Sequence, residues 1–195
     1  MDSILTYEQG SDLVKQVRVI LELKAKSTNF NPEMVEKNLQ AYSMTSRVKV
    51  RLLHYPTGTQ IAESDVVGPA ALSSALVRAT LSVAALAGSA HLYRNSIDEM
   101  TVELLILGAP MLLQGSYIKR RSSINPAVDG IMLTYGNHKA MVFPDSSLQR
   151  NTMLEEVCKS AGLPSTYWTQ GKVQLYKFST QRFIEATPNG AVALQ

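Results

Sequence analysis

Residues 129–185 constrain the fold of this 195-residue chain more than any other stretch. Residues 129–135 and 140–143 are rich in β-prone side chains, and between them lie Gly136 and Asn137. Gly and Asn accept the positive φ angles that a tight turn demands. The pattern therefore predicts a β-hairpin at the start of this stretch.

A helix and a strand are predicted to follow the hairpin. Ser146 or Ser147 provides an N-terminal cap, and Gly162 stands where the helix end needs a left-handed residue. Residues 173–184 then alternate as a last strand. We expect the hairpin, the helix and this strand to bury their apolar positions together as one cooperative unit.

Further elements are predicted upstream from hydrophobic periodicity and cap residues. They are helices starting at Ser11, at Asn31 (to about Tyr42) and at Pro69 (to Leu86), and strands over residues 47–52, 60–63 and 100–107. The fold class is therefore α+β, with a mixed, mainly antiparallel sheet and flanking helices. A single domain over 1–195 is expected from the length, with loose tails at 1–10 and 186–195.

Composition excludes several classes of protein. Hydrophobic residues make up 45% of the chain, enough for a sizeable core, and the net charge of +3 permits but does not demand an anionic partner. The single cysteine, Cys158, rules out an intramolecular disulfide and fits a reducing compartment. Without a secretory signal, and with residues 69–90 too rich in Ala and Ser to span a membrane, a soluble cytoplasmic protein is expected.

Residues able to carry nucleophilic or metal chemistry are sparse. Cys158 falls on the apolar side of its predicted helix, where packing is the expected role. The three histidines, His54, His91 and His138, have no ligand partner three or four residues away, so no metal or other cofactor is predicted. No phosphate-cradling glycine loop and no nucleophile elbow occurs.

Two basic concentrations are candidate binding residues. The first is one face of the strand over 47–52, and the second lies in a predicted surface connection over 111–128, next to Tyr117; they comprise Arg47, Lys49, Arg51, Lys119, Arg120 and Arg121. We interpret both as solvated surfaces, since acidic residues are interspersed. The alternative is RNA or DNA binding, which uses basic residues beside exposed aromatics.

Glu103 interrupts an otherwise apolar strand. A buried carboxylate is costly unless it is paired, so we expect a cross-strand bridge to the basic face of residues 47–51. The alternative is an enzyme whose site is assembled from distant polar residues: Glu103, Glu63, His54 and Arg51. That hypothesis requires the four side chains to converge.

Four stretches resemble a known family. Residues 158–164, Cys-Lys-Ser-Ala-Gly-Leu-Pro, with Trp168 after them, resemble C-x-K-A-G-L-P-x-x-x-W, except for Ser160. Residues 175–185 resemble L-Y-R-F…F-x-E, residues 129–144 resemble D-G-L-I-x-x-Y-G…L-P, and residues 102–107 resemble I-E-V-S-V-L. The chain is similar to the family named after the AMME chromosomal region gene product, with the best-matched core at 99–185.

One family motif is missing. The resemblance would place L-R-G-C-I-G at residues 60–68, which keep neither its Arg nor its Cys. The resemblance implies an α+β fold with a smaller subdomain, and partners among MEMO-like or radical-SAM proteins. We expect a non-catalytic binding or adaptor module with a protein partner, nucleic acid being the less favoured partner and the oligomeric state left open.

Overall fold

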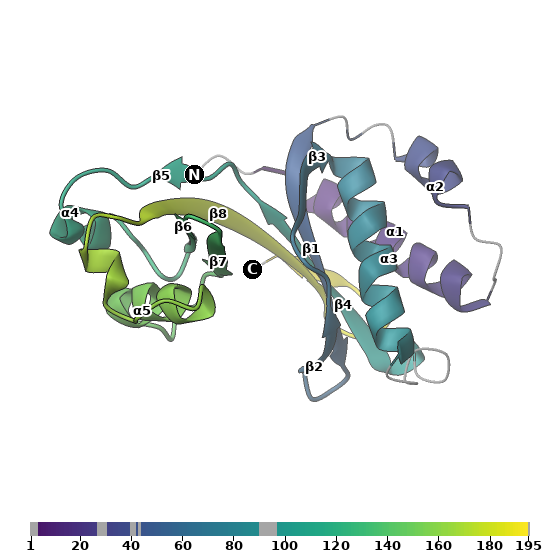
Figure 1. Ribbon diagram of the computed structural model, residues 1–195. Helices are drawn as coiled ribbons and strands as arrows, with labels where there is room; N and C mark the ends of the chain where they lie inside the picture. The colour runs from purple at the N-terminus through teal and green to yellow at the C-terminus, as the bar shows by residue number, and fades with distance from the viewer. Residues whose placement is uncertain (1–3, 27–30, 40–41, 43, 90–96, 195) are drawn as a thin grey trace. The chain divides into compact units, whose positions relative to one another are not determined.

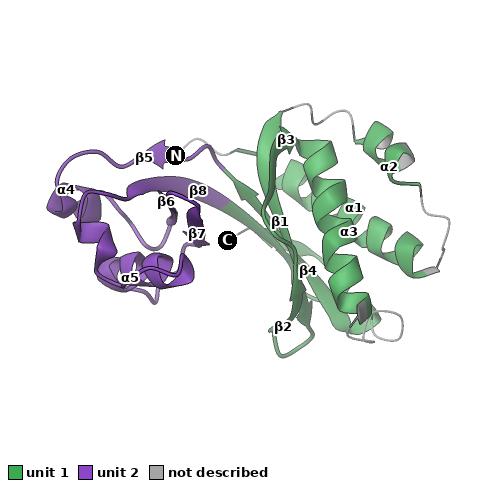
Figure 2. Ribbon diagram, in the orientation of Figure 1, with its two compact units in different colours: residues 1–107, 181–195 green, residues 108–180 purple. Residues whose placement is uncertain are grey.

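The computed structural model describes residues 4–26, 31–39, 42, 44–89 and 97–194 (Figure 1). The chain divides into two compact units (Figure 2). Unit 1 comprises residues 1–107 and 181–195, and unit 2 comprises residues 108–180. The smaller unit agrees with the subdomain that the resemblance implied, whereas a single domain over 1–195 stays a prediction.

Unit 1 is a sheet with helices on one face (Figure 1). Its strands are β1 (Thr45–His54), β2 (Thr59–Glu63), β3 (Val67–Ala71), β4 (Met100–Leu107), the end of β8 (Gln174–Glu185) and β9 (Val192–Leu194). They follow the order β2-β1-β4-β8, with β3 also pairing with β1 and β9 with β8. The helices are α1 (Tyr7–Lys26), α2 (Pro32–Asn38) and α3 (Leu72–Ser89), and a short turn, η1 (Ile97–Glu99), precedes β4.

The core of unit 1 forms where the helices meet the sheet. On β1, Val48, Val50 and Leu52 are fully buried, as their alternation predicts. The predicted stripe of α1 is buried with them. Every residue of β4 is buried, which explains its nearly continuous apolar run.

Unit 2 contains the predicted hairpin. Strands β6 (Asp129–Tyr135) and β7 (His138–Val142) pair antiparallel, and Gly136 has φ +55° in the turn between them. The first half of β8 pairs with β6, and the short β5 (Met111–Leu112) also pairs with β8. The unit is completed by α4 (Tyr117–Ser122), α5 (Arg150–Ser160) and η2 (Tyr167–Thr169).

The buried core of unit 2 confirms that the elements after residue 129 pack together. The side chains of Cys158 and Trp168 lie in one apolar cluster with Ile131, Leu133 and Leu175. Gly162 has φ +71° directly after α5, as its place in the sequence predicts. The predicted fold class, mixed α+β with a mainly antiparallel sheet, is therefore confirmed.

Several predicted helix boundaries were wrong. Pro69 lies in β3, so α3 begins at Leu72; a proline in an edge strand costs no ladder hydrogen bond. Helix α5 begins at Arg150, because Ser147 instead bonds the Asp145 carboxylate through its N–H at 2.8 Å. Asn31 caps α2 as predicted, but the helix ends at Asn38 rather than near Tyr42.

The chain ends and the 111–128 connection also differ from expectation. The first helix begins at Tyr7, and Leu5 is buried before it, so residues 4–10 are not a loose tail. Residues 192–194 pair with β8 as strand β9. The connection over 111–128 contains β5 and α4. The short strands β5 and β9 are held by pairing with β8, which local periodicity does not record.

Candidate functional site

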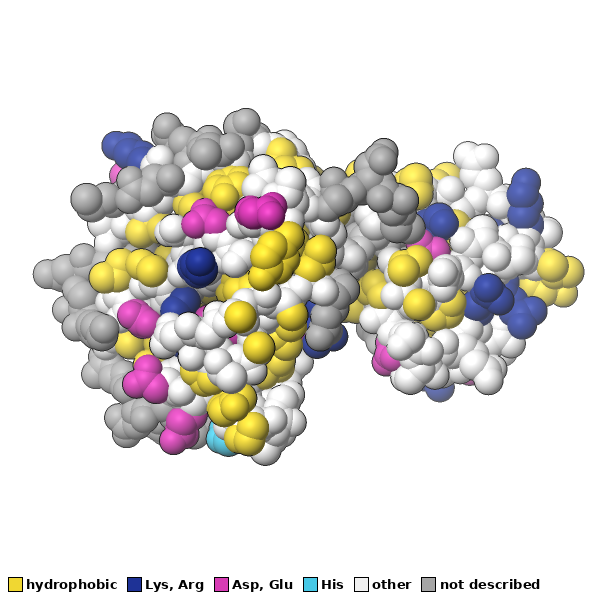
Figure 3. Space-filling model, turned by 180° about the vertical axis from the view of Figure 1, so that it is seen from behind, with side chains coloured by type: hydrophobic (Ala, Val, Ile, Leu, Met, Phe, Trp, Pro, Cys, Tyr) yellow, Lys and Arg dark blue, Asp and Glu magenta, His cyan; other side chains and the backbone are white. Residues whose placement is uncertain are grey.

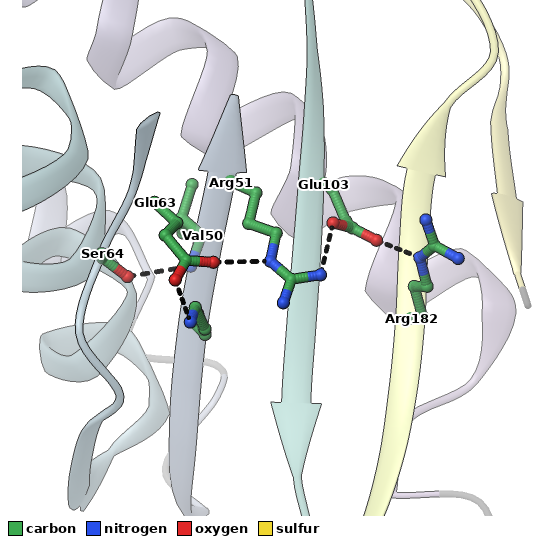
Figure 4. A network of polar contacts seen from close by, with 7 residues as sticks. Val50, Arg51, Glu63, Ser64, Glu103 and Arg182 are labelled. Atoms are coloured by element: carbon green, nitrogen blue, oxygen red, sulfur yellow. Dashed lines mark hydrogen bonds and ion pairs between the residues drawn. The ribbon is translucent and has the colours of Figure 1, made fainter. Parts of the chain in front are cut away.

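A ladder of alternating charges crosses the sheet of unit 1 (Figure 4). Arg51 on β1 stands opposite Glu63 on β2 and opposite Glu103 on β4. Its Nε lies 2.9 Å from Glu63 Oε2, and its Nη1 lies 3.2 Å from Glu103 Oε2. Lys49 Nζ lies 2.8 Å from Glu63 Oε1, and Arg182 on β8 pairs with Glu103 Oε1. The ladder thus joins four strands.

The cross-strand bridge predicted for Glu103 is confirmed. The Glu103 side chain is 1% exposed, and both of its oxygens accept hydrogen bonds from guanidinium groups. Pairing with two cations offsets the desolvation of the buried carboxylate. The ladder charges are thereby committed to one another, which is the pattern of a structural network.

Glu63 has a pKa set by opposing effects. Burial by itself raises the pKa of its carboxyl, but Lys49 and Arg51 outweigh burial and lower the pKa below its usual 4.5. A carboxyl with a lowered pKa in the folded state contributes stability above its unfolded-state pKa. That contribution is lost as the pH falls through the folded-state pKa.

Glu63→Gln is therefore expected to make stability less sensitive to acid. The wild type should have the larger free energy of unfolding at neutral pH, and its advantage should shrink as the pH falls from about 5 to about 3. Urea unfolding across that range measures the difference. Glu99→Gln, at an exposed residue of η1, is the matched control. An advantage that persists unchanged at the acid end would contradict the assignment.

The four residues of the alternative enzyme site lie only partly together in the structure. Glu103, Glu63 and Arg51 are joined by the ladder. His54 is exposed at the end of β1, three positions beyond Arg51 and hence on the other strand face, where its Nδ1 lies 3.3 Å from Thr57 Oγ1. The required convergence of all four side chains is not found.

The other titratable candidates hold structural positions. His138 Nδ1 bonds the Ala161 carbonyl oxygen at 2.7 Å, and His91 lies outside the described residues. The Cys158 thiol is fully buried, and this burial raises its pKa. Within the described ranges, no three His, Cys, Asp or Glu side chains are grouped closely enough to hold a metal ion.

The basic strand face is not the solvated surface that was expected. Lys49 is buried beside Glu63, and Arg51 lies between two carboxylates. Arg47 is half-buried opposite Leu107. Two of these three binding candidates are thus committed to ion pairs within the sheet.

The second basic group lies on helix α4, where a charged residue is buried and the apolar residues are exposed, the reverse of the usual pattern. Arg120 is 6% exposed and donates to the carbonyl oxygens of Trp168 at 3.1 Å and of Val173 at 3.4 Å. Its apolar neighbours Tyr117 and Ile118 are 46% and 60% exposed. Sequence reasoning missed this inversion. The available signal was two large apolar residues directly before Lys-Arg-Arg.

We call Tyr117, Ile118, Lys119 and Arg121, which are all exposed, the α4 surface. A concavity of about 360 Å³ adjoins it, lined by Arg121, Pro126, Leu148, Gln149, Arg150 and Asn151. Two arginines therefore share a hollow that has no acidic side chain in its lining. Figure 3 shows Lys and Arg side chains beside exposed hydrophobic ones on unit 2, at the right of the view.

Positive charge is concentrated in unit 2. Residues 108–180 contain eight Lys or Arg and four Asp or Glu, a net charge of +4. The remaining residues contain eleven Lys or Arg and twelve Asp or Glu, a net charge of −1. The mild total of +3 therefore conceals one basic unit.

Comparison with known proteins identifies the family of this α+β protein. The AMMECR1 family model matches residues 71–183, more than half of the sequence, and the chain belongs to this family. The match begins after residues 60–68, the stretch in which the resemblance implied the L-R-G-C-I-G motif and the sequence has neither its Arg nor its Cys.

Archaeal proteins are similar to this chain. A protein from Methanocella arvoryzae is 28% identical over 195 residues, covering 97% of each chain, and one from Methanococcus aeolicus is 30% identical over 107 residues, about half of each. The crystal structure of Protein PH0010 from Pyrococcus horikoshii has a TM-score of 0.82 over 98% of both chains at 22% identity, which shows a shared fold. Among the described helices, none has the length and apolar content to span a membrane.

Proposed function

We propose that this AMMECR1-family protein is a non-catalytic binding module whose working surface is the α4 surface of unit 2. One observation carries the proposal: on α4 Arg120 is buried, whereas Tyr117 and Ile118 are exposed beside the cations Lys119 and Arg121. Burying an isoleucine side chain gains about 1.5–3 kcal/mol. Ile118 is 60% exposed, so a partner that covers it would gain part of that free energy.

The α4 surface is held in a fixed orientation. Arg120 ties the helix to η2 and to the residue just before β8 through two backbone carbonyls, and the Tyr117 ring meets Trp168 edge-on with ring centroids 6.1 Å apart. The Ser116 hydroxyl caps the helix by accepting from the Lys119 N–H at 3.4 Å. A surface fixed before binding loses less conformational entropy when the partner arrives.

An enzyme is the weaker candidate. In the charge ladder Glu63 and Glu103 already bond cations, and the raised pKa of the buried Cys158 thiol disfavours a thiolate nucleophile. Nucleic-acid binding has support from Lys119 and Arg121 beside Tyr117. The MEMO-like or radical-SAM partners and the cytoplasmic location stay predictions.

The proposal is tested by selecting ligands against the purified protein from two pools, random 12-residue displayed peptides and random single-stranded RNA. The counter-target is Ile118→Asp/Arg121→Glu. The matched control, Val19→Asp/Lys139→Glu, introduces the same two acidic residues in place of an exposed aliphatic and an exposed cationic residue outside the α4 surface. At least one pool should yield ligands that bind wild type and control about ten-fold or more tighter than the counter-target.

Two results would overturn the proposal. One is that no selected ligand distinguishes the counter-target from the control. The other is turnover of ester, phosphomonoester or phosphodiester substrates that is lost in Glu63→Gln or Glu103→Gln. Thermal unfolding of each variant establishes that it is folded.

A further inference from the structure

The concavity beside α4 is basic and partly apolar. Arg121 extends from α4, Arg150 begins α5, and Pro126 and Leu148 add apolar wall. The Arg150 Nε donates to the Ile124 carbonyl oxygen at 2.6 Å, which anchors the guanidinium group at the wall. Neither arginine forms an ion pair with an acidic residue in the part of the chain that the structure describes.

An apolar anchor lies next to this basic hollow. Ile118 and Arg121 are three residues apart on α4, and side chains at that spacing are neighbours on a helix. Ile118 is the most exposed of the large hydrophobic side chains that the structure describes. An apolar contact and a cationic contact therefore lie one helical turn apart.

We propose that the partner of this surface is a protein segment that is acidic and amphipathic. The inference rests on the proposed binding function and specifies its partner. A carboxylate of the segment enters the concavity between Arg121 and Arg150, and an apolar side chain three or four residues away covers Ile118. Guanidinium groups bind carboxylates through paired hydrogen bonds, and the +4 charge of unit 2 attracts an acidic segment.

The exposed side chains favour a protein over a nucleic acid. Ile118 is aliphatic, as are the exposed Met111 and Leu112 of β5 in the same unit. Aliphatic groups pack against apolar side chains, whereas nucleic-acid binders present aromatic faces for stacking. Tyr117 is the exposed aromatic residue of α4, and its ring is already engaged by Trp168.

The same two-pool selection tests the inference by the composition of its ligands. We expect the peptide pool to yield α4-dependent ligands enriched in Asp or Glu, with an apolar residue three or four positions away. A labelled peptide from that pool should bind Arg121→Gln and Arg150→Gln about ten-fold more weakly in fluorescence anisotropy. Lys139→Gln, at an exposed residue of β7, should change its affinity less than two-fold.

A charge-reversed peptide gives the sharpest test. Replacing the acidic residue of the peptide by lysine should abolish binding to wild type and restore it with Arg121→Glu/Arg150→Glu, which also guards against an unfolded variant. Failure of this rescue, peptides without acidic enrichment, or α4-dependent ligands from the RNA pool alone would overturn the inference. Peptides without acidic enrichment, or α4-dependent ligands from the RNA pool alone, would contradict the acidic partner but leave the proposed binding function intact. Ligands that bind independently of α4 would contradict both the acidic partner and the binding function.

Discussion

Replacing Arg18 with alanine is expected to lower the free energy of unfolding by about 3–5 kcal/mol. Arg18 lies on α1 and is 4% exposed, and its guanidinium pairs with Glu185 of β8. It also donates to the carbonyl oxygens of Ile97 at 2.9 Å and of Met100 at 2.6 Å. Its removal would leave the buried Glu185 carboxylate without its cation and would take one hydrogen-bond donor from the Met100 carbonyl, and both groups are costly to leave undersatisfied away from water.

Urea unfolding followed by circular dichroism measures this loss. Lys15→Ala, one turn earlier on α1 and exposed, is the matched control and should change stability by less than about 0.5 kcal/mol. Glu185 also accepts from the Val102 N–H at 2.9 Å, so Glu185→Ala should be comparably destabilising. A loss below about 1 kcal/mol in Arg18→Ala would contradict a buried ion pair here.

The second large effect concerns Phe183, whose ring packs against helix α1 at Gly10, a residue that has no side chain. Phe183→Ala should cost about 3–5 kcal/mol, because its ring is fully buried in the core of unit 1. A Cβ placed on Gly10 of α1 would lie 1.9 Å from the Phe183 ring. Gly10→Ala alone should therefore cost about 1–3 kcal/mol through overpacking, despite the better helix propensity of alanine.

The two substitutions should not be additive. Once Phe183 is alanine, Gly10→Ala no longer meets the ring, and it should stabilise the double variant by up to about 1 kcal/mol. A double-mutant cycle by urea unfolding gives the coupling, which we expect to be about 2 kcal/mol. Gly88→Ala, on α3 where an added Cβ meets nothing within 4 Å, is the control substitution. Additive costs would show that the ring and the helix are not in contact.

The stability of unit 1 and the proposed function of unit 2 both depend on a buried arginine. Arg18 holds α1 to the sheet, and Arg120 holds α4 so that its apolar residues face solvent. Because arginine presents several donors in a rigid fork, one side chain can satisfy two or more backbone carbonyls. In both places a charged residue occupies a position that a simple hydrophobic pattern would assign to the surface.

The candidate sites show how far sequence reasoning extends. The bridge between Glu103 and the basic strand was predictable because antiparallel neighbours on one face must meet, and a buried carboxylate needs a cation. The environment of Lys119, Arg120 and Arg121 was not predictable. Their helix is six residues long, which is too short for periodicity to show which side is buried.

The sequence by itself determined the strongly patterned elements of this protein. The hairpin around Gly136, the helix end at Gly162 and the buried strand β4 follow from local rules, because turn residues and hydrophobic alternation restrict each segment without reference to the rest. Tertiary structure decided which charges are buried. Arg18 and Arg120 become interior residues because carboxylates and carbonyls that are distant in sequence meet them, and local pattern carries no record of such partners.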